Sequence, residues 1–254
     1  FEMLGNSSFG DYFKKEAILW SWEYITEHLK LDINRLWVTV YTTDDEAYDI
    51  WVNEVGISKD RIVRLGDSDN WWAAGPIGSC GPCSEIYFDT QNMGENNEEI
   101  NAKPGDEGNR FLEIWNLVFT EWNRLEDGSL VPLPEKNIDT GAGIERIASV
   151  MQNKKTNFDT DIFMPIINEI RNVLNLKEGQ EDVSTKIIAD HIRASVFLIC
   201  DGVLPSNEGR GYILKKLIRR AYGAGSIANK NIFDKGLSFL YQIVNSVVAS
   251  MSGA

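Results

Sequence analysis

The hydrophobic pattern of this chain changes partway along, and this change constrains the fold more than any other feature. Before about Asp139, short strand-like runs alternate with helix-like runs, and from Asp139 onward nearly every segment has a helical pattern. Strands followed by helices favour an α+β domain and then an all-helical domain. We therefore predict an α+β domain over residues 1–160 and a helical domain over residues 161–254.

Within the first domain, local signals predict individual helices and strands. Ala17–Leu31 is predicted to be a helix, with an apolar face formed by Ile18, Trp22, Ile25 and Leu29. Asp44 can cap a second helix that runs to about Val55 and ends at Gly56. Strands are predicted where β-branched and aromatic residues gather, at Leu36–Tyr41, Arg61–Leu65, Glu85–Asp89 and Phe111–Trp122.

Three connecting segments separate these runs. We predict a loop rich in Gly, Pro and Cys at Gly75–Pro82, and an acidic, Asn-rich loop at Gln91–Asn109. Asp127–Gly128 is expected to turn the chain into Ser129–Leu133, which indicates an antiparallel hairpin. Trp20, Trp22 and Trp37 are interpreted as core residues.

Composition narrows the class of protein. No run of about 18 uncharged apolar residues occurs, so no membrane span is expected. Three cysteines in 254 residues do not make a disulfide framework, which favours a reducing cytoplasm. The chain starts without Met or a secretory signal pattern, so an internal start is expected.

The net charge of −13 is unevenly distributed. Thr185–Lys230 holds eight Lys and Arg against three acids, a net charge of +5, which leaves −18 for the remainder. Because salt screens each field within about 10 Å, a basic segment on an acidic protein can still bind RNA. The alternative is that these charges form an ordinary solvated helix surface.

The segment Asp139–Arg146, DTGAGIER, carries the most specific chemistry. Its two glycines permit close backbone approach, and a following helix offers free N–H groups. Asp139 is placed to hold a ligand ammonium, and Arg146 can reach a phosphate with its bidentate fork. The alternative is a helix start that is capped by Asp139 or Thr140.

DTGAGIER resembles motif 3 of the class II aminoacyl-tRNA synthetases, in the form that alanyl-tRNA synthetases use. Phe1–Phe13 is similar to the second half of motif 2 of that family. Four further segments resemble the family in its order: SCGPCSEIYFD, EIWNLVF, ADHIRASVFLICDGV and PSNEGRGYILKKLIRRA. The resemblance covers essentially the whole chain. It implies a class II synthetase-type antiparallel sheet with flanking helices, followed by an all-helical tRNA-binding domain.

The resemblance also implies an alanine pocket. Asp139 would hold the substrate ammonium, Trp72 would form a wall, Asn116 would hydrogen-bond the substrate, and Gly141 would leave room for the methyl group. Such a pocket excludes larger residues sterically but cannot strongly reject glycine or serine.

For ATP, the family implies a second set of residues. Arg146 would bind the γ-phosphate and, with Asp139, serve catalysis. Glu113, in a Glu-x-x-Asn spacing, would help hold Mg²⁺, which prefers oxygen ligands. Phe1 and Met3 would line the adenine site, and Gly143 would contact ATP. ATP and Mg²⁺ are the expected cofactors. No zinc is expected, because the His-x-x-x-His pattern of the family's editing domain does not occur.

The basic segment would meet the acceptor stem of tRNA(Ala). In the family, the Asn that matches Asn207 is implicated in reading the G3·U70 pair; here the alternative is a helix N-cap. The residues expected to bind tRNA are Asn207, Arg210, Lys215, Lys216, Arg219 and Arg220.

Three functional hypotheses follow. The leading one is an alanine–tRNA ligase. Motif 1 and the first strand of motif 2, with its α-phosphate arginine, would precede Phe1, so a tRNA-binding paralogue without independent activity is the alternative. A thiol or metal protein built around Cys80 and Cys83 is the third. Ser79 departs from the family, because it replaces the Pro expected in a Gly-Pro-Cys-Gly-Pro-Cys loop.

Overall fold

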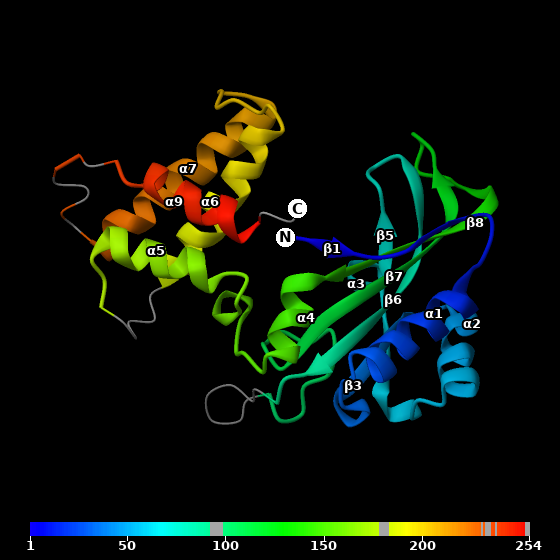
Figure 1. The fold of residues 1–254 in the computed structure, drawn as a ribbon. Helices are drawn as coiled ribbons and strands as arrows, with labels where there is room; N and C mark the ends of the chain where they lie inside the picture. Colours follow the sequence, from blue (N-terminus) through cyan, green and yellow to red (C-terminus); the bar gives the residue numbers. More distant parts are fainter. Residues whose placement is uncertain (92–98, 178–182, 230, 232–234, 237, 252–254) are drawn as a thin grey trace. The chain divides into compact units, whose positions relative to one another are not determined.

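The computed structural model describes residues 1–91, 99–177, 183–229, 231, 235–236 and 238–251. The chain divides into two compact units, Phe1–Lys155 and Thr156–Ala254 (Figure 1). The division lies five residues before the boundary expected at residue 160. All described strands belong to the first unit, and the described regular elements of the second unit are helices.

An eight-stranded sheet forms the first unit, with the path β1-β8-β7-β6-β3-β4; β2 also pairs with β8, and β5 with β6. Among the described strands only β3 and β4 pair in parallel, so the predicted antiparallel sheet is mixed by one pair. The strands are β1 (Met3–Leu4), β2 (Ser7–Phe9), β3 (Leu36–Tyr41), β4 (Ile62–Leu65), β5 (Trp71–Ala73), β6 (Gly78–Asp89), β7 (Phe111–Arg124) and β8 (Leu130–Gly143).

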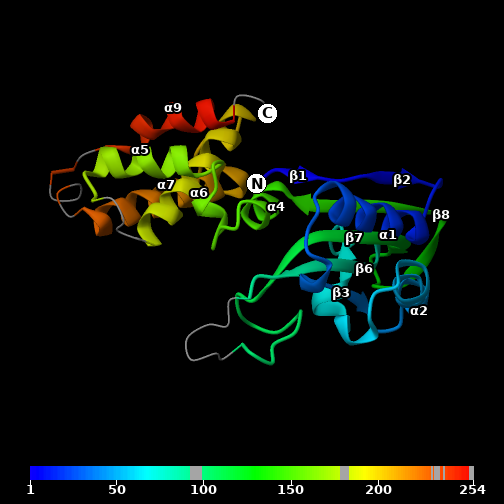
Figure 2. The ribbon, with the colours of Figure 1, turned by 60° about the horizontal axis from the view of Figure 1, so that its bottom comes forward.

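Two helical segments cover one face of this sheet. The first is α1 (Lys14–Glu23), which continues as a π-helical turn to His28 and lies along the sheet in Figure 2. The second is α2 (Asp45–Asp49), which continues to Val55. The predicted cap is confirmed, since the Asp44 carboxylate accepts the Ala47 amide. Gly56 ends the helix with φ of 80°, in the left-handed region that favours glycine.

The main core lies between these helices and the sheet. The predicted apolar helix face is confirmed: Ile18 and Ile25 are buried, and Trp22 and Leu29 pack against the same cluster. Trp20, in contrast, is 49% exposed, so its assignment to the core was wrong. It packs edge-on against Tyr12 at the surface. Sheet residues that complete the core are Leu36, Val38, Val40, Ile86, Leu117, Phe119, Ile138 and Ala142.

The loop predicted at Gly75–Pro82 is wrong from Gly78 onward, because β6 begins there. The pairing of β6 with β7 shifts register between Cys80 and Cys83, which marks a β-bulge. A Cβ at Gly81 would collide with the carbonyl oxygen of Phe119. Glycine and proline therefore mark a bulge inside a strand here, instead of a loop between strands.

The helix predicted from Asp139 begins later than expected. Strand β8 continues to Gly143, and only then does α4 (Ile144–Met151) start. Neither Asp139 nor Thr140 caps this helix, so that alternative is wrong. The strand persists because β7 pairs with β8 as far as Ala142 and β1 pairs with Gly143. The turn predicted at Asp127–Gly128 does join β7 to β8.

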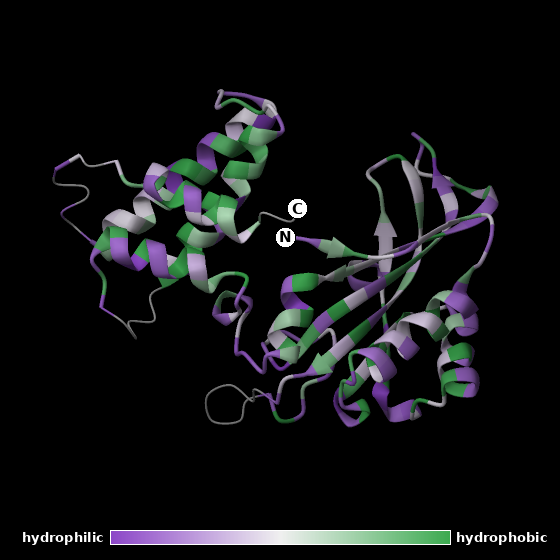
Figure 3. Cartoon of the chain, in the orientation of Figure 1, coloured by the Kyte–Doolittle hydropathy of each residue, from purple (hydrophilic) through white to green (hydrophobic). Residues whose placement is uncertain are grey.

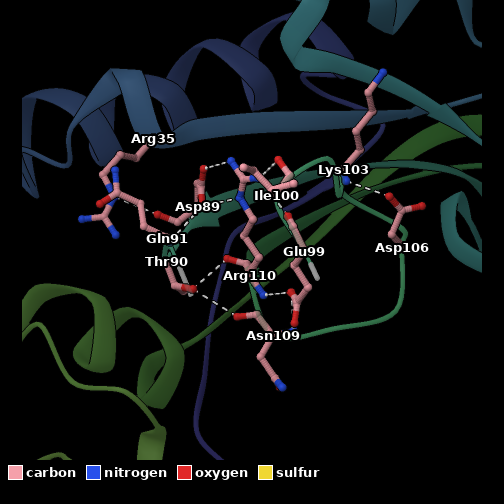
Figure 4. Close-up of polar contacts among 10 residues, drawn as sticks. All are labelled: Arg35, Asp89, Thr90, Gln91, Glu99, Ile100, Lys103, Asp106, Asn109 and Arg110. Carbon is pink, nitrogen blue, oxygen red and sulfur yellow. Dashed lines mark hydrogen bonds and ion pairs between the residues drawn. The ribbon is translucent and has the colours of Figure 1, made fainter. Parts of the chain in front are cut away.

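Polar contacts hold the described part of the acidic loop where it joins the sheet (Figure 4). Asp89, at the end of β6, pairs with Arg110, just before β7, at 2.9 Å. Arg110 also donates to the carbonyls of Glu99 and Ile100. The Glu99 carboxylate accepts the backbone N–H of Asn109 and of Arg110. Residues 92–98 of this predicted loop lie outside the described residues.

A second core holds the helical unit together. Buried side chains on its helices include Ile166, Ile170, Ile188, Leu214 and Ile243, and hydrophobic residues recur among hydrophilic ones along these helices in Figure 3. Among the described helices, each falls short of what crossing a membrane requires. They are α5 (Met164–Leu174), α6 (Val183–Cys200), α7 (Gly209–Ala228) and α9 (Leu240–Ser250).

Candidate functional site

The face of the sheet opposite α1 and α2, here called the second face, carries a row of polar positions. Thr39, Glu85, Asn116 and Gly141 are successive partners across β3, β6, β7 and β8. Their neighbours along the strands belong to the core, and side chains alternate between the faces of a sheet. Four residues distant in sequence therefore lie side by side, and we call them the polar row.

Asp139 lies beside the polar row on β8. It is two residues from Gly141, so both occupy the same face, and its strand partners are Val118 and Ser7. Asp139 is exposed. Among the described residues its carboxylate has no hydrogen-bond or ion-pair partner. A free carboxylate at this place can receive a cationic group.

Met3 covers the glycine of the row. A Cβ added at Gly141 would lie 2.7 Å from the Met3 sulfur, and β1 places Met3 opposite Gly143. The sequence assigned the space beside Gly141 to a small substrate side chain, but the Met3 thioether lies there. Met3 is 53% exposed, and its unbranched side chain adapts to irregular gaps.

Glu113 and Arg146, both expected at the ATP site, are held together. The Arg146 Nη1 lies 2.8 Å from the Glu113 Oε2 and also donates to the Glu113 carbonyl at 2.9 Å. The first residue lies on β7, opposite Tyr87 on the second face, and the other is in the first turn of α4. The strand-to-helix junction therefore brings a cation to Glu113 on β7, three residues from Asn116 of the polar row.

Glu85 is a functional candidate that the sequence analysis missed. It is only 6% exposed and accepts three hydrogen bonds: from the Asn116 Nδ2 at 3.0 Å, the Tyr87 hydroxyl at 2.8 Å and the Thr39 hydroxyl at 3.4 Å. Burial, and then the nearby charge of Glu113, raise the pKa of Glu85 to about 7. The sequence did contain a signal for Glu85: an acidic residue inside an otherwise apolar strand is seldom buried without a reason.

Two further expected residues, Trp72 and Phe1, come from other segments. Trp72 is on β5 and pairs with Gly81 of β6, so β6 and β7 lie between β5 and β8. Phe1 precedes β1 and is 85% exposed. The structure thus brings together Asp139, Gly141, Asn116 and Met3, and separately Glu113 and Arg146.

In the helical unit, Asn207 does not cap α7. Glu208 is the N-cap residue, and the Asn207 amide oxygen accepts instead from the Lys215 Nζ at 2.7 Å. The N-cap alternative is therefore wrong. Lys215 is partly buried, whereas the remaining expected tRNA contacts on α7 are exposed: Arg210, Lys216, Arg219 and Arg220.

The thiols of Cys80 and Cys83 are buried. Burial, followed by the charge of Glu85, raises the pKa of Cys83 to about 12, so its thiol is neutral near pH 7. A neutral, enclosed thiol is a poor nucleophile, which argues against a redox site. In the part of the chain that the structure describes, no three His, Cys, Asp or Glu side chains gather as ligands would around a metal ion.

Comparison with known proteins identifies relatives along the whole length. Residues 1–254 match the family described as tRNA synthetases class II (A). The chain is 58% identical to the alanine–tRNA ligase of Fusobacterium nucleatum, over 98% of this chain and 28% of that protein. It is 52% identical to the alanine–tRNA ligase of Petrotoga mobilis, over 99% of this chain and 28% of that protein. The alanine–tRNA ligase of Idiomarina loihiensis is 46% identical, over 100% of this chain and 28% of that protein. The chain thus spans about 28% of the length of these curated relatives.

Proposed function

Since this chain belongs to the class II tRNA synthetases, we propose that it activates alanine with ATP and transfers it to the 3′ end of tRNA(Ala). Identities of 46–58% to alanine–tRNA ligases support this proposal. The observation that carries it is the exposed carboxylate of Asp139, unpaired among the described residues, beside Gly141 and one strand from Asn116. The alternative of a non-catalytic paralogue has no observation in its favour.

Alanine would bind on the second face. Its ammonium would pair with Asp139, and the amide of Asn116 would hydrogen-bond it. Burying a methyl group contributes only about 0.8 kcal/mol, so selectivity must come from excluding larger side chains. Met3, over Gly141, narrows the space next to the row and would serve that exclusion. Trp72 would be a more distant wall.

The chemistry needs no protein nucleophile. The alanine carboxylate attacks the α-phosphorus of ATP, forming alanyl-adenylate and releasing pyrophosphate. The terminal ribose hydroxyl of tRNA then attacks the activated carbonyl and AMP leaves. The protein contributes positioning and stabilisation of the phosphoryl charge.

ATP would bind near the Glu113–Arg146 pair. Within the described residues Arg146 uses only Nη1 toward Glu113, so its other N–H groups are left for a phosphate. Glu113 fits Mg²⁺, because that ion commonly takes one or two carboxylates together with substrate phosphates. When bound, Mg²⁺ neutralises phosphate charge. Phe1, Met3 and Gly143 would line the nucleotide, since β1 pairs with the end of β8.

The acceptor stem of tRNA(Ala) would meet the basic residues of α7 and Asn207. The exposed cationic side chains of Arg210, Lys216, Arg219 and Arg220 support phosphate contacts. The cytoplasm remains the proposed location, as expected for a partner in protein synthesis.

The test is ATP–pyrophosphate exchange by the full-length protein with alanine, with serine and glycine at equal concentration, and without an amino acid. We expect exchange that depends on alanine, with weaker activity toward the other two. Aminoacylation of tRNA(Ala) by the same preparation tests the second step. The proposal would be refuted if the exchange did not depend on alanine, or if it favoured another amino acid over alanine.

A further inference from the structure

Glu85 is the centre of a buried hydrogen-bond network on the second face. Three donors converge on its carboxylate: the Asn116 Nδ2 on Oε1, and the hydroxyls of Tyr87 and Thr39 on Oε2. The Thr39 hydroxyl in turn accepts from the Asn70 amide. An ionised carboxylate only accepts hydrogen bonds, so it fixes which end of each partner faces it.

For Asn116 this fixes the amide orientation. Its nitrogen faces Glu85, so its oxygen must face away from that carboxylate. Within the described residues the Asn116 Oδ1 is buried and has no hydrogen-bond partner. Leaving a buried acceptor unpaired is unfavourable, and native proteins seldom do so without a functional reason.

The position of this unpaired oxygen identifies a suitable donor. Asn116 stands in the polar row between Glu85 and Gly141, and Asp139 lies next to it on the same face. An ammonium has three N–H donors. It can therefore satisfy the Asp139 carboxylate and still donate to a neutral oxygen one strand away.

We propose that Glu85 is a positioning residue of the alanine site, which holds the Asn116 amide so that its oxygen accepts an N–H from the substrate ammonium. This inference rests on the proposed function. Glu85 itself touches no substrate, and it acts only through Asn116. The opposing explanation is that Glu85 merely stabilises the sheet, which would affect alanine and ATP alike.

The experiment measures alanine and ATP KM values separately by exchange at pH 8, in the full-length protein. Glu85→Leu removes the acceptor, so the alanine KM should rise about 10-fold while the ATP KM stays within about 2-fold. Glu85→Gln keeps an amide oxygen for Asn116 and should restore the alanine KM to within about 3-fold of wild type. Tyr87→Phe is the matched control. It removes another hydrogen-bond donor to Glu85 but leaves the bond between Glu85 and Asn116, so the alanine KM should stay near that of wild type.

A double-mutant cycle separates positioning from a general effect. If Glu85 acts through Asn116, the pair Glu85→Leu and Asn116→Ala should raise the alanine KM no further than Asn116→Ala alone. Multiplying effects, or equal rises for alanine and ATP, would overturn the proposal. Should Glu85→Leu fail to fold, Glu85→Asp withdraws the acceptor with less disturbance and carries the same prediction.

Failure of the proposed function is distinguishable from failure of this role. Wild-type protein without alanine-dependent exchange would overturn both. Normal wild-type exchange combined with an unchanged alanine KM in Glu85→Leu would overturn only the role of Glu85.

Discussion

At Asp139 a single exposed carboxylate stands beside the only residue of the polar row that lacks a side chain, Gly141. We expect Asp139→Asn to raise the alanine KM and to lower kcat/KM by about 10- to 100-fold, or about 1.4–2.8 kcal/mol. The substitution replaces the proposed ion pair with the alanine ammonium by a hydrogen bond to a neutral amide, and it keeps the shape of the side chain. Exchange kinetics at varied alanine and varied ATP measure it.

Arg146→Ala is the contrasting variant for that prediction. Arg146 is held by Glu113, away from Asp139 along the second face, so its loss should raise the KM for ATP and leave that for alanine nearly unchanged. If Asp139→Asn weakened ATP and Arg146→Ala weakened alanine, the two assignments would have to be exchanged.

The three cysteines should differ sharply in reactivity. With a pKa of about 12, Cys83 has on the order of 10⁻⁴ of its thiol ionised at pH 8, and the thiolate is the reactive form. Cys200 is exposed, so a maleimide should label it first in the native chain. Mass spectrometry after timed labelling locates the modified residue, with Cys200→Ser as the control that removes the fast reaction. Labelling of Cys83 as fast as Cys200 would restore the thiol-protein hypothesis.

At the scale of elements, Asp89 and Arg110 join the end of β6 to the start of β7. Burial alone would raise the pKa of Asp89. The hydrogen bonds from Arg110 and from the Gln91 amide, with the charge of Arg110, nevertheless hold it below its ordinary value. Because the pKa of Asp89 is lower in the folded chain, its ionised carboxylate stabilises the fold. This stabilisation is fully present above the pKa of an Asp in the unfolded chain, about 4, and is lost as the pH falls through the pKa in the folded chain.

We therefore expect Asp89→Asn to lower the free energy of unfolding by about 1–3 kcal/mol at pH 7. The difference from wild type should shrink toward pH 3, because the wild-type carboxyl is then being protonated. Urea unfolding at several pH values measures both effects. Asp11→Asn is the control, since Asp11 is exposed. A difference independent of pH would contradict an ionic role.

At the scale of the molecule, charge divides between the two units. Residues 1–155 hold 28 acids and 14 bases, a net charge of −14, whereas residues 156–254 hold 10 acids and 11 bases, a net charge of +1. An RNA would be repelled by the first unit and attracted mainly by the exposed bases of α7. The phosphate-binding effect should therefore concentrate on that helix.

We expect Lys216, Arg219 and Arg220, each replaced by Ala, to weaken binding of all tRNAs alike. Each lost phosphate contact should reduce the log–log salt slope by somewhat under about one unit. Filter binding at four salt concentrations measures the slope. Lys186→Ala, on α6, is a control of equal charge change. An unchanged slope would mean that these charges are only a solvated surface.

Asn207→Ala should act selectively against an acceptor stem that carries G3·U70, by about 1–3 kcal/mol by analogy with DNA base contacts. Because Lys215 donates to the Asn207 amide oxygen, Lys215→Ala should show part of the same selectivity. Aminoacylation of two minihelices, with and without that pair, measures it. Equal losses on both substrates would exclude base reading by Asn207.

Local patterns in the sequence were enough to predict the elements that depend on nearby residues. The strand at Leu36–Tyr41, the cap at Asp44 and the turn at Asp127–Gly128 all follow from residue types within a few positions. The resemblance in Asp139–Arg146 was specific enough to indicate the family that the whole-chain match shows. Hydrophobic periodicity and turn preferences depend on residues that are close in the sequence, so they can be predicted without the tertiary structure.

Only the tertiary structure decided what depends on residues far apart in the chain. Pairing with β7 and β1 kept Asp139–Gly143 extended, and a bulge absorbed Gly81 and Pro82 into β6. Asn116 meets Glu85 across 31 residues, and the pKa of Glu85 depends on burial that no local pattern reveals. Strand register and burial are properties of the assembled sheet, which is why the polar row became visible only in the folded chain.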